Sequence, residues 1–526
     1  MSAVAASRRV DCIVIGAGHN GLVCATYLAR AGRSVLVVEA AERVGGAAIT
    51  REFAPGHRVS AGAHLLHLMP AALRSELGLA AHGLKFAAEA LPTTALATDG
   101  APLAVGTAGL AALAARSARD AAAWPAFTAR LGKFARALYP LLDSVPPRLG
   151  TDSWDDRLAF LKLGWRIRTL GRRDMREFLR IIGMNAYDLL TDEFETPLLK
   201  GALGLDAVLG TNFGPRAPGT VLTLLNRLAA ESSVGALPLA QPLGGMGALS
   251  DALAGACRAA GATIRTGARV AAIRVVDDRV AGVVLESGET IDAGSVLSSA
   301  DAKTTFLKLL GTQHLDTGFV RRVDHLRSRG LAAKLHLALD RVPAFTGVDA
   351  RALGGRLVIA PSLDYIERAW NHSKYGECSR APTLEITVPT VNDPALAPAG
   401  RHVLSAVVQY LPLEPKGGWA AARAGCLETL LATLEAHAPG LRASVTASEL
   451  LTPADLEREF GMSGGHWHHG ELAFDQFYMV RPVPGAAQYS APVAGLYLCG
   501  AAGHPGGGVM GLAGRNAARA FLKGAA

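Results

Sequence analysis

Three glycines close to the N-terminus have the spacing of a turn that binds phosphate. Gly16, Gly18 and Gly21 follow an apolar run at residues 11–15 and precede a helical pattern at residues 22–31. Gly16 permits the tight turn, Gly18 lets the backbone approach a pyrophosphate, and Gly21 allows the helix to pack closely against the strand. The amides and the dipole at the start of that helix favour an anion. The pattern therefore predicts a dinucleotide site.

An acidic residue completes this motif. Glu39 follows a second predicted strand at residues 34–38, where a carboxylate accepts hydrogen bonds from a ribose diol and disfavours a 2′-phosphate. We therefore expect an ADP-ribose group without that phosphate. The neighbouring residues are predicted to line the same site, namely His19, Asn20, Ala40, Arg43, Gly45 and Gly46.

A second unit of the same kind ends the chain. Residues 495–500 are expected to form a buried strand, a glycine loop follows at 506–511, and residues 516–523 form a predicted helix. A chain that begins and ends with strand, glycine loop and helix is expected to bring both units together around one cofactor. The substrate domain is then built from the residues between them.

The length of 526 residues predicts two to four domains, because a single core of that size is rare. Alanine- and leucine-rich periodicity makes residues 100–235 mostly helical, a second α/β stretch follows, and residues 310–480 mix strands with helices. The predicted organisation is a dinucleotide-binding domain in three parts, a largely helical substrate or cap region, and a substrate domain of strands and helices. The dinucleotide-binding domain covers residues 1–70, 236–310 and 481–526. The helical region covers residues 71–235, and the substrate domain covers residues 311–480.

Composition excludes several classes of protein. The net charge of +8 comes with no nucleic-acid-binding motif, so no nucleic acid is expected as a partner. No apolar run reaches the roughly 18 residues of a membrane span, and residues 1–10 leave no room for a secretory signal. The six cysteines include no CxxC pair, which predicts reduced, inert thiols and argues against a disulfide reductase. We expect a protein that is cytoplasmic or peripheral to a membrane.

These motifs resemble those of the two-dinucleotide-binding-domain flavoproteins. They resemble more closely the phytoene desaturase-like family of carotenoid and retinoid oxidoreductases, nearest to the branch that contains pyridine nucleotide-disulfide oxidoreductase domain-containing protein 2. The motifs that carry the resemblance are the N-terminal glycines with Glu39, the run Gly244-Gly245-Met246-Gly247, the pair Arg269-Val270, and the C-terminal runs at 469–471, 475–476, 481–485, 495–500, 504–509 and 514–518.

The resemblance implies an α/β fold with a Rossmann-like FAD-binding domain, an inserted mixed α+β substrate domain and a helical cap. It implies noncovalent FAD, with the adenosine at residues 16–39 and the isoalloxazine ring near Gly45, Gly46 and residues 506–510. Further FAD contacts are implied at Val270, Gly500, Gly507, Gly508, Val509 and Met510. Ala47 stands where many relatives have an arginine, and Ala41 lacks a polar contact of some amine oxidases, so amine oxidation is disfavoured.

The implied activity is hydride transfer between an apolar, isoprenoid or lipid-like substrate and flavin N5, as in a desaturase or saturase. Only one GxGxxG is present, so the expected electron acceptor is oxygen or a quinone. Two alternatives stay open. One is an FAD-binding regulatory or interaction protein without robust turnover, and the other is a flavin amine oxidase.

Several histidines lie in the segments that flank the predicted flavin ring. His64 and His504 are the candidate catalytic residues, because an imidazole there could move a proton or position the substrate, and His67 is a weaker candidate. The dense run His466, His468 and His469 is expected to line the active site rather than to bind a metal, since neighbouring side chains on an extended segment point to opposite faces.

A basic segment at residues 158–184 carries seven Lys and Arg side chains among leucines, isoleucines and a tryptophan. Such a segment can lie on an anionic membrane and admit a lipid-soluble substrate. The alternative is a helical cap with a solvated basic face, and many soluble helices have this pattern. Both interpretations stay open, with the solvated cap favoured.

Overall fold

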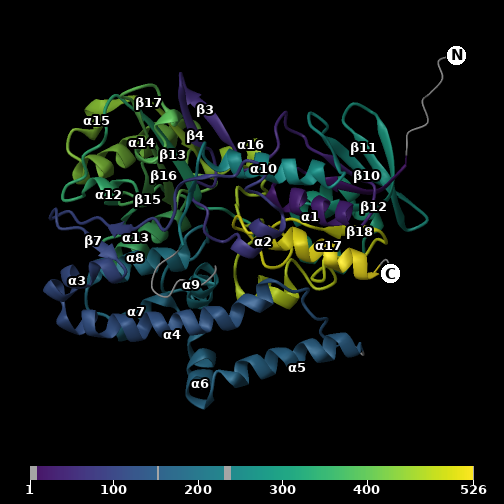
Figure 1. Ribbon diagram of the computed structural model, residues 1–526, viewed down its shortest axis with the longest axis horizontal. Coiled ribbons are helices and arrows are strands. Elements are labelled where there is room, and N and C mark those ends of the chain that lie inside the picture. Colours follow the sequence, from purple (N-terminus) through teal and green to yellow (C-terminus); the bar gives the residue numbers. More distant parts are fainter. Residues whose placement is uncertain (1–8, 151–152, 230–237, 525–526) are drawn as a thin grey trace.

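The computed structural model describes residues 9–150, 153–229 and 238–524. Within these residues the chain folds around two large sheets, one on the side of both termini and one at the far end of the molecule (Figure 1). Helices from the middle of the chain lie below both sheets in that view. The two sheets draw on different parts of the sequence, so each is described separately.

The first sheet contains the N-terminal and C-terminal units together. Its strands run in the order β10-β11-β12-β1-β2-β9, with β18 paired to β12. β1 is parallel to both β2 and β12, which explains why its residues 12–15 are all apolar and buried, as in parallel strands covered on two faces. The bounds are β1 (Val10–Ile15), β2 (Val35–Val38), β9 (Thr263–Arg265), β10 (Val270–Val276), β11 (Arg279–Leu285), β12 (Thr290–Ser298) and β18 (Leu496–Leu498).

Three helices pack on one face of the first sheet. They are α1 (His19–Arg30), α10 (Met246–Ala259) and α17 (Leu512–Gly524), and α1 contacts both of the others. One side of each helix is apolar and buried, so the three share a core with β1 and β2. This packing brings the first and last segments of the chain against each other, as the two glycine units predict.

The second sheet belongs to the central part of the chain. Its order is β17-β13-β16-β15-β14-β6-β7, and all neighbours are antiparallel except β14 and β6. Every residue of β13 is buried, because the sheet has a helix-rich core on each face. The bounds are β6 (Thr93–Ala95), β7 (Leu103–Val105), β13 (Ala332–Leu339), β14 (Arg356–Ile359), β15 (Thr383–Thr387), β16 (His402–Gln409) and β17 (Val445–Leu451).

A layer of helices completes the substrate side. α4 is long, and α8 and α9 pack together beside it, whereas α5 and α6 extend away from the body at the bottom of Figure 1. The bounds are α3 (Leu110–Arg116), α4 (Ala118–Leu142), α5 (Trp154–Thr169), α6 (Arg172–Ile181), α7 (Ala186–Glu193), α8 (Pro197–Val208) and α9 (Thr220–Leu228).

Shorter elements connect these layers. Two small ribbons pair β3 (Thr50–Ala54) with β4 (His57–Ser60) and β5 (Phe86–Ala88) with β8 (Gln241–Pro242). The remaining α-helices are α2 (Ala71–Glu76), α11 (Thr317–Asp324), α12 (Ala350–Leu353), α13 (Leu363–Lys374), α14 (Gly418–His437), α15 (Leu441–Ser444) and α16 (Pro453–Phe460). A π-helical turn, η2, covers Thr304–Leu310, and short 3-10 turns are η1 (Thr107–Gly109), η3 (Thr312–His314), η4 (Pro389–Val391), η5 (Pro394–Leu396), η6 (Phe474–Gln476) and η7 (Tyr478–Val480).

The α/β fold class and its Rossmann-like sheet are confirmed. The predicted domain ranges stay a prediction, and the sheets add one detail to them: β6 and β7, from the region predicted as helical cap, join the second sheet. The predicted boundary between residues 235 and 236 lies outside the described residues. None of the helices in the described ranges is long and apolar enough to cross a bilayer.

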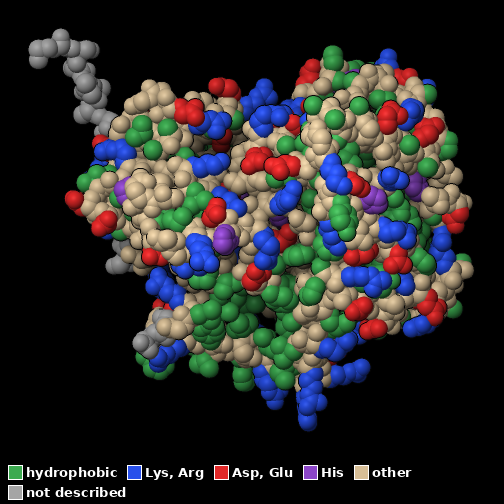
Figure 2. All heavy atoms as spheres, turned by 180° about the vertical axis from the view of Figure 1, so that it is seen from behind, with side chains coloured by type: hydrophobic (Ala, Val, Ile, Leu, Met, Phe, Trp, Pro, Cys, Tyr) green, Lys and Arg blue, Asp and Glu red, His purple; other side chains and the backbone are tan. Residues whose placement is uncertain are grey.

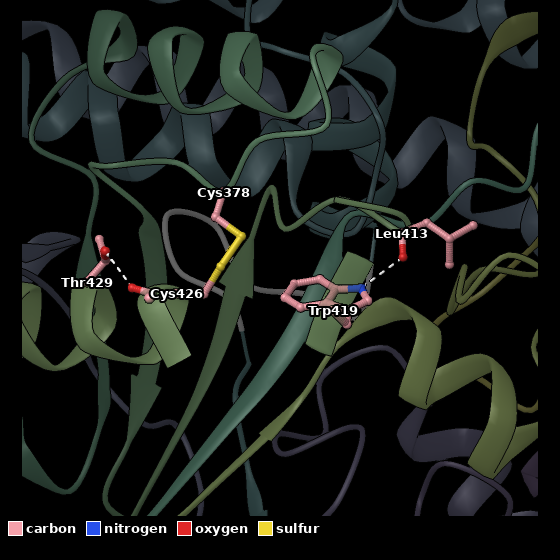
Figure 3. The surroundings of a disulfide bond; sticks show 6 residues. Cys378, Leu413, Trp419, Cys426 and Thr429 are labelled. Atoms are coloured by element: carbon pink, nitrogen blue, oxygen red, sulfur yellow. Dashed lines mark hydrogen bonds between the residues drawn. A yellow bond between two sulfur atoms is a disulfide. The ribbon is translucent and has the colours of Figure 1, made fainter. Parts of the chain in front are cut away.

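The prediction that all six thiols are reduced is wrong for one pair. Cys378 and Cys426 form a disulfide between the loop after α13 and the helix α14 (Figure 3). The two residues are 48 positions apart, and only the packing of α14 brings their side chains together. The other cysteines, Cys12, Cys24, Cys257 and Cys499, are free and buried, which agrees with inert thiols.

Candidate functional site

A cavity of about 480 Å³, called the cleft below, extends from the first sheet to the second. Its first half is lined by most of the residues predicted to bind the cofactor: Gly16, Gly18, His19, Asn20, Gly21, Glu39, Ala40, Arg43, Gly45, Gly46, Val270, Gly500, Gly508 and Val509. Gly507 and Met510, also predicted there, do not line it. A side chain at Gly507 would meet His468, and Met510 is buried in the core behind the loop.

The glycines of the first turn serve two different purposes. A Cβ atom on Gly21 would lie 2.1 Å from the carbonyl oxygen of Gly16, so this position must be glycine for α1 to approach the turn. Gly16 has a φ of +91°, which is also a glycine conformation. A Cβ atom on Gly18, in contrast, would meet nothing within 4 Å. Space therefore remains beside Gly18, as a pyrophosphate cradle requires.

The second glycine pair closes this cradle from the other side. Gly45 and Gly18 form a parallel bridge, and the amide of Gly45 donates to the carbonyl oxygen of Ala17 at 2.9 Å. A Cβ on Gly45 would lie 2.9 Å from the hydroxyl of Ser250, so no side chain fits there. The 45–46 turn and the first turn thus present bare backbone to the same stretch of the cleft.

Glu39 is fixed at the end of β2 by backbone amides. One carboxylate oxygen accepts from the amide of Ala17 at 2.6 Å, and the other accepts from the amide of Ala41 at 2.9 Å. Each oxygen keeps a further lone pair for the hydroxyls of a ribose. Glycines, open backbone and a positioned carboxylate together fit the ADP half of FAD.

The second half of the cleft contains a lysine buried in β13. The Nζ atom of Lys334 lies 2.9 Å from Nδ1 of His64 and donates to the hydroxyl of Ser405 at 2.9 Å. Nε2 of His64 lies 3.0 Å from a carboxylate oxygen of Glu385. A neutral imidazole satisfies both contacts when Nε2–H donates to Glu385 and Nδ1 accepts from Lys334. Lysine, histidine and carboxylate therefore form one chain of hydrogen bonds at the cleft wall.

Burial controls the protonation of this chain. It lowers the pKa of Lys334 from 10.5 to about 7, although Glu385 opposes the shift. It lowers the pKa of His64 to about 4, and the neighbouring Lys334 adds to that effect. Near neutral pH the imidazole is thus uncharged, whereas the lysine can either hold a proton or release one.

A buried network of charges holds Glu385 in place. Its second oxygen accepts from Arg356 Nε at 2.6 Å and from Arg227 Nη2 at 3.0 Å. Both arginines also pair with Asp206, at 2.6 Å and 2.9 Å. Burial raises the pKa of Glu385, but the two arginines outweigh it and hold that pKa well below its usual range. The negative charges of the two acids offset the positive charges of the two arginines. Lys334 is therefore the titrating group beside a network without net charge.

Histidines surround the junction between the two halves. His19, His67, His468 and His469 line the cleft with Trp467, whose indole Nε1 donates to Nε2 of His468 at 2.9 Å. Burial, followed by the charge of His469, lowers the pKa of His19 to about 4. His466 faces Glu471 instead, at 3.5 Å. No group of three metal-ligating side chains occurs in the described ranges.

The two predicted catalytic histidines lie in different places. His64 lines the cleft, whereas His504 does not. The Nε2–H of His504 donates to the carbonyl oxygen of Leu141 at 2.8 Å, and its ring packs against Tyr478 and Phe477. The loop turns this ring toward α4, which removes it from any substrate in the cleft. The position of His504 therefore differs from the expectation.

The predicted site residues do not include Lys334, Glu385 and Arg227, although all three line the cleft. A signal was present for two of them. Lys334 interrupts the largely apolar strand β13, and Glu385 stands between Leu384 and Ile386 in β15. A charge in a fully buried strand needs a partner. Arg227 lies on an amphipathic helix, where an arginine is ordinary, so nothing local distinguished it.

The chain matches the family model described as flavin containing amine oxidoreductase over residues 21–522. It is 37% identical over 547 residues to pyridine nucleotide-disulfide oxidoreductase domain-containing protein 2 of Rattus norvegicus, across 98% of this chain and 93% of that protein. It is 27% identical to a phytoene desaturase (lycopene-forming) of Pseudescherichia vulneris, across 69% and 72% of the two chains. An oxidoreductase structure from Methanosarcina mazei has the same fold, with a TM-score of 0.61 at 18% identity over 98% of this chain and 100% of that chain.

Proposed function

Because the chain belongs to the family of flavin containing amine oxidoreductases, we propose that it oxidises or reduces a carbon–carbon bond of an apolar, isoprenoid or lipid-like substrate. Membership of that family makes it an FAD-dependent oxidoreductase, and the cradle around Gly18 and Glu39 fits this cofactor. The carbon–carbon chemistry is supported by its likeness to a protein named phytoene desaturase.

The observation that carries the proposal is Lys334 at the substrate end of the cleft. Removing two hydrogens from adjacent carbons releases a hydride and a proton, and bound FAD supplies the hydride acceptor. In this proposal the neutral amine of Lys334 takes the proton, since its pKa of about 7 balances acceptance and release near neutral pH. His64 orients the amine, and the charge network behind Glu385 keeps His64 in place.

Amine oxidation is the second candidate, and the family match favours it. Two features of the cleft weigh against it. A protonated Lys334, beside a network whose charges balance, repels an ammonium substrate at the end where it would react. Among the described lining residues, only Phe460 and Trp467 belong to the Phe, Tyr and Trp group, and a cage for an amine needs several such rings.

Anaerobic reduction of the flavin distinguishes these functions. The purified holoprotein is mixed with linear or cyclic isoprenoid hydrocarbons, or with alkyl amines and diamines, and the loss of the oxidised flavin absorbance is followed. We expect reduction by a hydrocarbon, followed by reoxidation with oxygen or a quinone, which we propose as acceptors. Reduction by amines, followed by release of peroxide once oxygen is admitted, would instead establish an amine oxidase. A stable yellow protein whose flavin is neither reduced nor reoxidised by any of these substrate classes would favour a regulatory or interaction role.

The mode of FAD binding is proposed to be noncovalent. None of the described residues that line the cleft is a cysteine, so a thioether link to the flavin has no donor there. Denaturation with acid should release all the flavin into the supernatant. Flavin that stays with the precipitated chain would contradict this part of the proposal.

A further inference from the structure

Two helices extend from the body of the protein and form what we call the basic arm, residues 154–184. α5 and α6 make up this arm at the bottom of Figure 1. α5 has no buried residue along its whole length, in contrast to α4, α8 and α9. Its apolar side chains therefore contribute little to the core, and another explanation for them is needed.

The most exposed apolar side chains of α5 lie on one face. Trp154, Leu161 and Trp165 are separated by seven and four residues, so they lie in one row along the helix. Their exposed fractions are 78%, 67% and 71%. Leu179 of α6 adds a further exposed leucine. Two tryptophans in an exposed apolar row are typical of a helix that lies in the interface of a bilayer.

The arm is nevertheless anchored to the body on its other side. Phe178 of α6 packs edge to face on Phe134 of α4, with ring centres 5.5 Å apart. The Nζ atom of Lys133 donates to the carbonyl oxygen of Leu170 at 2.9 Å, and Lys523 pairs with Asp155 of α5. These contacts orient the arm, so its exposed row faces away from the protein.

Positive charge accompanies the exposed row. The arm contains eight Lys and Arg residues and four Asp and Glu residues. Three of the acids already pair with a cation of this chain. Within the described residues, Arg168, Arg172, Arg173 and Arg176 make no ion pair. Blue side chains project at the lower edge of Figure 2, with green side chains nearby. The unpaired charge is thus mainly basic and lies on the same arm as the tryptophans.

We propose that the basic arm docks this protein on the surface of an anionic lipid bilayer, with the row of Trp154, Leu161 and Trp165 inserted among the lipids. The arginines then contact the lipid phosphates, to which their planar donors are suited. A second copy of the chain fits this surface less well, because pairing two arms brings two sets of unpaired arginines together. This inference is independent of the reaction proposed above.

Flotation of the full-length, flavin-loaded protein with vesicles tests the proposal. Vesicles of phosphatidylcholine are compared with vesicles that also contain phosphatidylglycerol. We expect the protein to float with the anionic vesicles and to be released by high salt, because exposed charges are screened. The triple variant Trp154→Ser, Leu161→Ser and Trp165→Ser should lower the apparent partition coefficient roughly tenfold or more. Arg168→Gln with Arg172→Gln and Arg173→Gln should weaken binding to the anionic vesicles.

A matched control removes three exposed apolar side chains elsewhere, with exposed fractions of 53%, 46% and 68%. The triple variant Val276→Ser, Val342→Ser and Tyr375→Ser should bind vesicles like the unmodified protein, and flavin absorbance reports that all variants are folded. Equal binding to both vesicle types, or binding that the arm variants do not change, would overturn the proposal. A dimer that the arm variants dissociate, in a protein that binds no vesicles, would overturn it in favour of a second copy.

Discussion

The two halves of the cleft are built by different means. The cofactor half is made of backbone: turns at Gly16–Gly21 and Gly45–Gly46, with one carboxylate, Glu39, held by two amides. The substrate half is made of buried charged side chains from several strands and helices, centred on Lys334 and Glu385. Backbone recognises groups that every FAD shares, whereas side chains recognise what is particular to one reaction. For this reason the cofactor half can be recognised from the sequence, whereas the substrate half cannot.

Removal of one arginine from the charge network should have the largest effect. Arg356→Met leaves Asp206 and Glu385 buried with less compensation, and breaking a buried ion pair in this way costs about 3–5 kcal/mol. Urea unfolding followed by fluorescence measures this loss. The matched control is Arg327→Met, whose pair with Asp475 is solvent-exposed and contributes about 1 kcal/mol or less. Equal losses in the two variants would show that the network does not stabilise the substrate half.

Loss of the disulfide should destabilise the substrate half without affecting flavin binding in the cofactor half. Cys378→Ala with Cys426→Ala removes a cross-link that closes a loop of 48 residues in the substrate half, which costs about 2–4 kcal/mol. Because neither cysteine lies near the cradle, flavin should stay bound at temperatures where the unmodified protein is fully folded. Differential scanning calorimetry and flavin fluorescence measure the two effects. If flavin is released at the same lowered temperature as the calorimetric unfolding transition, the two halves unfold as one unit.

Lys334→Met should lower the rate of flavin reduction by about a hundredfold, the scale of a lost general base. In the unmodified protein the rate should rise with pH through about 7, as the amine loses its proton, and the variant should be slow and flat. Rapid-mixing absorbance between about pH 6 and about pH 8, roughly one pH unit on each side of the midpoint, measures both effects. Lys308→Met, outside the cleft, is the control.

The same variant should be more stable. The fold depresses the pKa of Lys334 from 10.5 to about 7, so folding is penalised below pH 7, and the penalty fades as pH rises toward 10.5. Lys334→Met removes that penalty, because methionine is never charged. Its advantage in unfolding free energy should therefore be largest below about pH 7 and shrink at alkaline pH. A Lys334→Met protein that is less stable than the original at pH 6 would contradict the depressed pKa.

Substitutions at two glycines of one turn in the cofactor half should have the smallest effects. Gly21→Ala places a Cβ against the backbone of Gly16. It should lower the unfolding free energy by about 1–3 kcal/mol and should also cause loss of bound flavin. Gly18→Ala meets no protein atom, so the unfolding free energy of the flavin-free protein should change by about 0.5 kcal/mol or less. Flavin affinity should still fall by about tenfold, since the pyrophosphate approaches this backbone. Titration calorimetry measures the affinity.

The strands and helices of the cofactor half could be predicted well because their signals are local. Strands β1, β2 and β18 form at the predicted runs 11–15, 34–38 and 495–500, and α1 and α17 follow their glycine turns. The His504 ring and the Cys378–Cys426 pair could not be placed in this way. The direction of the His504 ring depends on a carbonyl group of α4, and the sulfur atoms meet because α14 packs on the second sheet.

By itself, the sequence determined the cofactor and the architecture that holds it. The spacing of Gly16, Gly18, Gly21 and Glu39 encodes the site directly, because all four residues lie within one strand–turn–helix–strand unit. Only the tertiary structure decided the chemistry at the other end of the cleft. Lys334, His64 and Glu385 lie 321 positions apart at the extremes, and the second sheet must form before they meet. Residues that act through long-range contact leave no periodicity to detect, so the reacting side chains became visible only in the folded protein.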